Sequence, residues 1–526
     1  MKRILLAFAF FLGISGFSSP AQAEWRVVES DHFVIYADDS ERDLQKFAEM
    51  LESYHSAMEF VSGRKVDKPS PSNRVTIYVV DDQKDIRELA RTKSRTLQGF
   101  YQPRAGGSLA FVQDIDVRGR EPSPSMLTLL HEYAHHFLIS SMRFGMPRWL
   151  SEGAAEFYSA SRFPKDGSVD IGRPANHRAA ELSYAESVSV HELLDPALYA
   201  ERKSNKYDEF YGKSWALYHY LTFNEARKGQ LGAYWRSMMS GKSSPDAAKE
   251  VFGDIDVLDR EISLYVKQNR MFYFSLLPEQ ISTGPVSVRT LSEGAAAIMP
   301  LKMISKRGVN EEEAAEVVVQ IREVAALYPD DPFVLEVLAE AEFDAGNDDA
   351  AIAAADRAIV LDPTAKNAYV QKGYALFRKA EDADDLAAAY EAAMVPFSKL
   401  NAIENNHPLP LIYYYRSFVE RGESPPEQAR LALEQASRLA PFDHGIAMNA
   451  GLMQAEEGKI ALARLTLQPV AANPHGGGAA RAAQALIDAM EQSEEGKPFR
   501  ASPSLKAAPA KANELDEDSE EGGDDA

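Results

Sequence analysis

The stretch His131-Glu132-Tyr133-Ala134-His135, followed by Trp149-Leu150-Ser151-Glu152-Gly153, decides how the rest of the chain is interpreted. His131 and His135 are four residues apart in a segment expected to be helical, so both side chains leave the same face. Two imidazoles at this spacing can bind one metal ion, and Glu132 borders that site from a neighbouring face. Two satisfied core histidines on an apolar helix are the alternative explanation of the five residues alone.

Glu152 lies on the next expected helix and supplies a third candidate ligand. Zinc accepts imidazole nitrogen and carboxylate oxygen, and catalytic zinc sites combine three protein ligands with water. At such a site Glu132 can take the proton of that water and pass it to a leaving amine. Glu156 lies one turn later on the same face as Glu152. It either accepts a hydrogen bond from a ligand histidine, with His131 favoured over His135, or belongs to a solvated helix face.

The histidines belong to a helix expected from Ser123-Pro124 to about Ser141, with a capping hydroxyl and a proline in the first turn. Apolar residues cover nearly all its faces, which predicts a buried helix. Burying so many polar groups is costly unless they are compensated, and a metal ion would provide compensation. His136 points to another face, where we expect a core or supporting role.

Upstream, residues 25–112 alternate between short β-branched runs and helical periodicity, which predicts a mixed sheet flanked by helices. An edge strand placed before the histidine helix could bind a substrate backbone by strand addition. Ser108–Val112 is the candidate for this edge, with an ordinary strand of the sheet as the equal alternative.

Downstream, the helical texture continues to about residue 278, and residues 279–292 are polar with Pro and Gly, which suggests a linker. Residues 293–490 are alanine-rich helical pairs. Pro329 recurs at Pro363, and 363 minus 329 is 34; Pro441 recurs at Pro474, a spacing of 33. This period matches tetratricopeptide (TPR) repeats, whose concave surface usually binds a peptide or protein, although the repeats could also only pack against the first domain.

The two ends of the chain carry their own signals. Residues 1–23 combine a basic start, an apolar run and a small-x-small site, which predicts a signal peptide and a secreted, periplasmic protein without a membrane span in the mature chain. Residues 491–526 end in an acidic stretch expected to be disordered. The net charge of −22 argues against a nucleic-acid binder, and the absence of cysteine excludes a disulfide framework.

HEYAHHF followed by PRWLSEGAAEFY resembles the gluzincin metallopeptidases, and the nearest resemblance is to bacterial peptidase MA-like proteins, where such a domain precedes helical repeats. The resemblance implies an α+β zincin-like metallopeptidase domain over 24–278 and an all-α TPR-like repeat domain. It implies that His131, His135 and Glu152 bind Zn²⁺ and that Glu132 is the general base. The GxMEN-type segment of the related aminopeptidases has no counterpart here, which disfavours an aminopeptidase.

The expected function is therefore a zinc endopeptidase acting on proteins or peptides, with a protein partner or substrate on the repeats. Gluzincins usually add a later Tyr or His that stabilises the oxyanion; Tyr211 is the first candidate and Tyr207 the second, each with packing as the alternative role. A catalytically silent scaffold acting through the repeats, and a metal-dependent hydrolase of a cell-wall peptide, are the alternatives.

Overall fold

The computed structural model describes residues 24–501 except 114, 116–120, 143, 205 and 474. The expected signal peptide and residues 502–526 of the expected tail lie outside the described residues. Within the described part of the chain, no helix is both long enough and apolar enough to cross a membrane.

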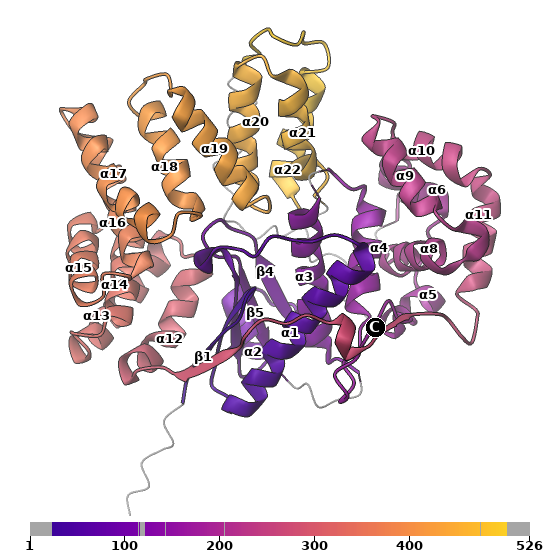
Figure 1. Ribbon diagram of the computed structural model, residues 1–526, viewed down its shortest axis with the longest axis horizontal. Helices are drawn as coiled ribbons and strands as arrows, with labels where there is room; N and C mark the ends of the chain where they lie inside the picture. The colour runs from indigo at the N-terminus through magenta and orange to yellow at the C-terminus, as the bar shows by residue number, and fades with distance from the viewer. Residues whose placement is uncertain are drawn as a thin grey trace, which may run out of the picture.

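A six-stranded mixed sheet forms the centre of the first domain (Figure 1). Its order is β4-β5-β3-β2-β1-β8; β2, β3 and β5 run parallel, whereas β4, β1 and β8 pair antiparallel with their neighbours. The strands are β1 (Arg26–Glu29), β2 (Phe33–Ala37), β3 (Val75–Val80), β4 (Gly99–Gln102), β5 (Leu109–Gln113) and β8 (Ser287–Thr290).

Of the two interpretations of Ser108–Val112, the edge strand is wrong and the ordinary sheet strand is confirmed, because β5 lies between β3 and β4. The chain reverses at the Gly106-Gly107 turn, so β4 folds back antiparallel on β5 and takes the edge itself. Among the described strands β4 pairs only with β5, and it lies against the histidine helix.

The two faces of the sheet are covered by different parts of the chain. Ile35 and Ile77 belong to the core shared with α1 (Glu41–Ser62), α3 (Pro124–Ser141) and α4 (Arg148–Ser159). Tyr78 and Phe111 belong instead to the cluster that packs against α2 (Gln83–Ala90) and α12 (Glu293–Lys306). Because successive side chains of a strand alternate between faces, the first helix of the second domain lies opposite α3.

A helical lobe completes the first domain. Gly153 on α4 sits so close to α8 (Phe210–Phe223) that a Cβ there would lie 2.5 Å from the Ser214 carbonyl oxygen. A short two-stranded sheet, in a region expected to be mainly helical, pairs β6 (Val169–Ile171) with β7 (Phe274–Leu276). The remaining helices are α5 (Glu181–Tyr184), α6 (Val190–Leu194), α7 (Pro196–Ala200), α9 (Gln230–Met239), α10 (Ser244–Phe252) and α11 (Ile255–Tyr265).

The segment expected as a linker, residues 279–292, contains β8, which pairs with β1 from Arg26↔Thr290 to Glu29↔Ser287. The backbone hydrogen bonds of this edge strand attach the second domain directly to the sheet. Residues 491–501, expected as the start of the tail, also pack: the Phe499 N–H donates to the Ala455 carbonyl at 2.9 Å and Ala501 is buried.

The second domain is a helical-repeat array in which consecutive helices pack on one another (Figure 1). The prolines of the 34-residue period, Pro329 and Pro363, each follow the end of a helix by two residues. The helices after α12 are α13 (Glu311–Leu327), α14 (Pro332–Asp344), α15 (Asp348–Leu361), α16 (Lys366–Ala380), α17 (Leu386–Ile403), α18 (Pro408–Val419), α19 (Glu427–Leu439), α20 (His444–Glu456), α21 (Ile460–Ala471) and α22 (Gly477–Ala489).

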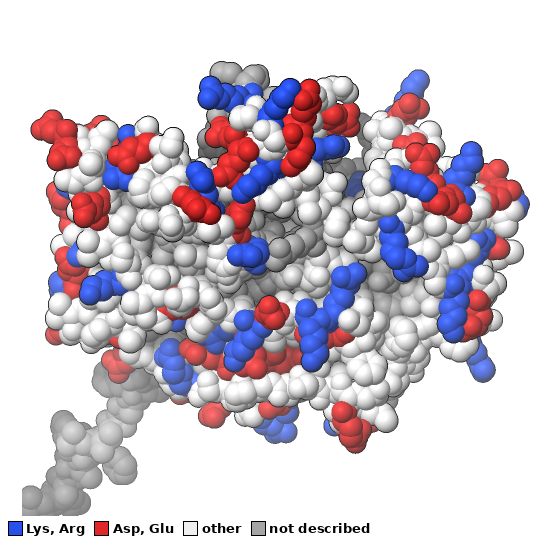
Figure 2. All heavy atoms as spheres, turned by 45° about the horizontal axis from the view of Figure 1, so that its top comes forward, with Lys and Arg blue, Asp and Glu red and all other residues white. Residues whose placement is uncertain are grey.

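The array curves around one end of the sheet, from α12 against one of its faces to α20–α22 beside α3 (Figure 1). Glu404 accepts hydrogen bonds from the Ser72 backbone N–H at 3.0 Å and from its hydroxyl at 2.9 Å. The Asn73 amide donates to the Leu439 carbonyl at 2.7 Å. Acidic and basic side chains are interspersed over the face shown in Figure 2, so the negative net charge is not gathered there in one patch.

Candidate metal centre

Helix α3 brings the two motif histidines together. It begins as expected, because the Ser123 hydroxyl accepts the Met126 N–H and Pro124 occupies the first turn. The Nε2 atoms of His131 and His135 lie 3.1 Å apart. His135 is buried and His131 nearly so, on a helix whose other faces pack into the core.

Glu152 of α4 completes a triangle of candidate ligand atoms. Its Oε2 lies 3.3 Å from Nε2 of His131 and 3.3 Å from Nε2 of His135. With zinc–ligand bonds of about 2.0 Å, two ligand atoms of a tetrahedral site are separated by about 3.3 Å. The three side chains therefore match zinc in both donor type and spacing, and they form a group that could hold a metal ion.

The burial of the Glu152 carboxylate, and its lack of aligned hydrogen bonds to the described residues, also favour a cation at this position. Its side chain is fully buried, and neither oxygen accepts an aligned hydrogen bond from any described residue. A buried carboxylate with imidazole nitrogens close by but no aligned hydrogen bond is costly unless a cation lies among them. Burial alone would raise the pKa of Glu152, but the neighbouring histidines outweigh it and hold the pKa well below its usual range.

Each histidine has a partner on its other ring nitrogen. Nδ1 of His131 lies 3.2 Å from Oε1 of Glu156, which is the contact expected of a tautomer-fixing carboxylate. Nδ1 of His135 lies 3.2 Å from the Ser151 hydroxyl. Glu156 was predicted for this role and Ser151 was not, although a hydroxyl directly before Glu152 in the motif was an available signal.

Glu156 is itself held by two basic side chains that were not predicted from the sequence. His177 Nε2 lies 2.6 Å from Oε2 of Glu156, and the Arg178 guanidinium donates to Oε1. Glu156 is 1% exposed, so it is a buried ion and not part of a solvated face. Burial opposes its ionisation, yet Arg178 and His131 outweigh burial and keep its pKa well below the usual range.

Glu132 and Tyr211 complete the candidate catalytic set. Glu132 is partly exposed. Burial chiefly, and the Glu132 charge in addition, raise the pKa of Tyr101. Burial opposes protonation of His475, but the contact with Glu152 and, less strongly, the Glu132 charge raise its pKa. Burial first, then the Glu152 charge, raises the pKa of Tyr211 to about 12, so its phenol keeps its proton at neutral pH. Tyr207 is half exposed and donates its hydroxyl to Glu181 at 2.8 Å, so it is already engaged elsewhere.

One further histidine reaches the centre from the repeat domain. His475 lies in the turn between α21 and α22, and its Nε2 is 3.2 Å from Oε1 of Glu152. Its ring meets that of His135 edge-on, with centroids 5.7 Å apart. No local pattern marks His475, because its importance depends on how the two domains dock. His136, in contrast, accepts from or donates to the Tyr101 hydroxyl at 2.6 Å and packs on Phe442, in agreement with a supporting role.

Comparison with known proteins adds little to what the geometry of the site shows. No family model matches the chain, and no curated protein matches it significantly. Among solved structures, a thermophilic TPR protein of Thermus thermophilus aligns with 33% of this chain and 90% of its own, at 15% identity and a TM-score of 0.29. That similarity is too low to argue from, so the repeat architecture rests on the helix arrangement itself.

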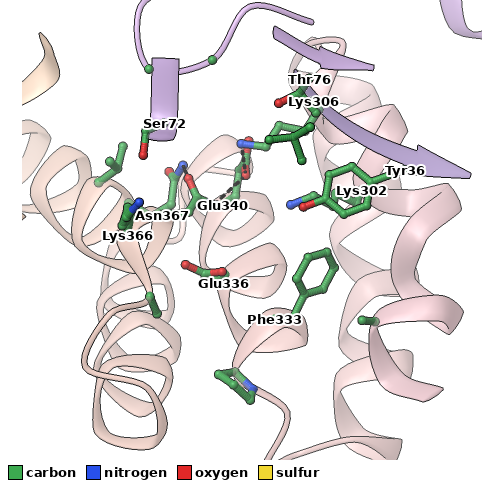
Figure 3. A pocket seen from close by; sticks show the side chains of 18 of the residues that line it. Tyr36, Ser72, Thr76, Lys302, Lys306, Phe333, Glu336, Glu340, Lys366 and Asn367 are labelled. Atoms are coloured by element: carbon green, nitrogen blue, oxygen red, sulfur yellow. Dashed lines mark hydrogen bonds and ion pairs between the residues drawn. The ribbon is translucent and has the colours of Figure 1, made fainter. Parts of the chain in front are cut away.

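A separate cavity of about 1000 Å³ lies on the opposite face of the sheet, between the strands and the inner side of the repeats (Figure 3). Tyr36 and Thr76 line it from the sheet, and Lys302 lines it from α12. Glu340 of α14 is held by Lys306 at 2.8 Å and by the Asn367 amide at 3.0 Å. None of the candidate metal ligands borders this cavity.

Proposed function

We propose that the protein is a zinc-dependent peptidase whose helical repeats bind a protein partner or substrate. The observation that carries this is the triangle of His131, His135 and Glu152, with edges of 3.1 to 3.3 Å around an unsatisfied buried carboxylate. A bound zinc ion would act there as a Lewis acid and lower the pKa of water.

The surrounding side chains have separate tasks in this proposal. Glu156 and Ser151 orient the two histidines through their Nδ1 atoms. Glu132 takes up the proton of the attacking water and returns it to the leaving amine nitrogen. Tyr211, a neutral phenol near Glu152, donates a hydrogen bond to the carbonyl oxygen of the substrate as negative charge develops on it.

A polypeptide is the substrate class that the surroundings favour. Strand β4, the edge of the described sheet, lies beside α3 and can add an extended peptide through backbone hydrogen bonds. The proposed location is the periplasm, on the strength of residues 1–23.

The proposal is tested by metal analysis and by cleavage of a mixed peptide library. We expect the wild type to bind one zinc ion and to cleave, and Glu132→Ala to retain zinc but lose at least about a hundredfold in rate. The rates are compared by mass spectrometry of the products. If the zinc-loaded wild type cleaves nothing, the peptidase proposal fails.

A catalytically silent interaction module is the second candidate, and one observation favours it. The repeats occupy much of the chain and dock on the sheet around a large cavity. In that case the wild type and Glu132→Ala both fail to cleave peptides, and both bind an identified partner equally well. Substitutions on the repeats, in contrast, abolish partner binding.

A further inference from the structure

The three candidate ligands differ in where their supporting partners come from. His131 is supported by Glu156, and His135 by Ser151, both on the adjacent helix α4. The only group near the remaining oxygen of Glu152, among the ion pairs of the described residues, is His475 of the repeat domain. Ligating carboxylates normally receive a hydrogen bond on their free oxygen, and Oε1 has this one neighbour to supply it.

The local backbone holds His475 in this place. Its N–H donates to the Asn473 side chain at 3.1 Å, which closes a tight polar turn after α21. The Asn473 amide in turn lies 3.3 Å from a ring nitrogen of His444 at the start of α20. Two helices of the repeat domain therefore determine where the imidazole points.

Close packing between α21 and the loop before α4 places this turn beside the candidate metal centre. At Gly145, in the loop before α4, an added Cβ would lie 2.6 Å from the Gln468 carbonyl oxygen and 2.7 Å from the Ala472 Cβ. Only glycine lets α21 approach this loop so closely. The position of His475 is thus coupled to a backbone contact that lies outside the ligand set.

We propose that the repeat domain completes the metal centre through His475, which donates a hydrogen bond from Nε2 to the free oxygen of Glu152 and positions that ligand. The inference rests on the proposed metal site and adds that zinc affinity depends on repeat docking. His475 is a positioning residue, not a fourth ligand, because it contacts Oε1 of Glu152, whereas the donor atoms of His131 and His135 gather at Oε2, and His475 does not belong to their group. In this arrangement the repeat domain contacts the candidate metal centre directly through His475.

The test measures zinc affinity of the full-length protein by competition with a chromogenic chelator, and the visible spectrum of the Co²⁺-loaded protein. We expect His475→Ala to weaken zinc binding by about tenfold or more, the effect typical of losing an outer partner of a ligand. His475→Gln keeps an N–H donor and should recover part of the loss. Gly145→Leu should weaken binding to a similar extent with His475 intact, because it forces α21 away.

His191 provides the matched control, since it is an exposed histidine paired with Asp256 instead of with a candidate ligand; His191→Ala should bind zinc as the wild type does. Circular dichroism shows whether each variant is folded. Wild-type zinc affinity and Co²⁺ spectrum in folded His475→Ala would overturn the inference. A loss of zinc affinity in His475→Gln as large as that in His475→Ala would also contradict the inference.

The readout separates this inference from the proposed function. A wild type that binds no zinc overturns both. A wild type that binds zinc without cleaving peptides overturns only the peptidase proposal, and equal zinc affinity in wild type and His475→Ala overturns only the role of His475.

Discussion

Two buried glutamates one turn apart on α4 organise the centre at the scale of single residues. Glu152 is surrounded by imidazole nitrogens, whereas Glu156 faces His131, His177 and Arg178. Only one of the two has its charge compensated by a permanent cation. This difference explains why Glu152 suits a metal ligand and Glu156 suits a support that fixes His131.

Glu156→Gln removes the charge beside His131 while keeping the size of the side chain. We expect zinc affinity to fall by about ten- to a hundredfold, because the tautomer and orientation of His131 are no longer fixed. Chelator competition at equilibrium measures the change.

Glu181→Gln is the control for Glu156→Gln. Glu181 also accepts from Arg178, at 3.1 Å, but its other hydrogen bonds among the described residues come from the Tyr207 hydroxyl and the Gly212 N–H, not from either candidate histidine ligand. Its replacement should leave zinc affinity near the wild-type value. Equal losses in the two variants would mean that Arg178, and not the contact to His131, accounts for the effect.

The sequence predicts the site residues that belong to a local motif. It does not predict those that come from distant segments and approach the site only in the folded protein. His131 and His135 are identified by their helical spacing and Glu152 by the motif on the following helix, and the three side chains lie together. Ser151 could have been inferred from the motif. His177 and Arg178 lie in a short 3₁₀ turn (Asn176–Arg178) without periodicity, and His475 comes from another domain, so no pattern near the motif reveals them.

At the scale of elements, α4, which carries Glu152, packs closely on α8, which carries Tyr211. Gly153 lies directly after Glu152, and its missing side chain lets the backbones of the two helices come close together. The packing of the two helices therefore explains why a glycine follows the candidate ligand Glu152. The boundaries of the histidine helix follow the sequence well, since the helix expected from Ser123-Pro124 to about Ser141 appears as α3.

Gly153→Ala tests this contact. The added methyl meets the backbone of Ser214, which cannot rotate away, so α4 and α8 must separate. We expect a loss of about 2 kcal/mol in the free energy of unfolding, the usual scale for overpacking, measured by chemical denaturation of the metal-free protein.

Gly232→Ala is the matched control, at an exposed position of α9. Its new Cβ meets only the flexible end of Arg236, at 3.3 Å. Replacing a helical glycine with alanine there should stabilise by up to about 1 kcal/mol. A Gly153→Ala protein as stable as the wild type would show that the two helices are less tightly packed.

Strand order was harder to predict than strand position. Short apolar runs identify β3 and β5, and only β3 is rich in β-branched residues. Whether a strand is central or at an edge depends on which other segment pairs with it. Strands β6 and β7 have only three residues each, too few for a periodic signal. Strand β8 resembles a linker in sequence because its residues are polar on the exposed edge of the sheet.

For the whole molecule, docking between domains is the property that the sequence leaves open. The contacts of Glu404 with Ser72 and of Asn73 with Leu439 join residues that are far apart in the chain, with no shared pattern to align them. The 34-residue period indicates the repeats but not their curvature around the sheet. The further role of His475 depends entirely on that curvature.

Stability of the whole molecule should fall on acidification, and His219 shows why. Its Nδ1 lies 2.7 Å from the Tyr265 hydroxyl and its Nε2 lies 3.0 Å from the Gly172 carbonyl, so both nitrogens are satisfied in the neutral ring. Burial lowers the pKa of His219 to about 4 from an ordinary value of 6.5. Between these values the unfolded chain binds more protons, so stability present above pH 6.5 is lost as pH falls.

We expect this one group to remove about 2 kcal/mol of stability between about pH 6.5 and pH 5. Burial also lowers the pKa of His55 to about 3, which acts in the same direction. Asp344 acts oppositely, because burial raises its pKa to about 7 and acidification then favours the folded state.

Denaturant unfolding of chelator-treated protein at about pH 7 and about pH 5 measures the combined effect of these groups on the free energy of unfolding. His219→Gln cannot titrate, so its stability should depend less on pH than that of the wild type; equal pH dependence would mean that His219 is not held neutral by the fold.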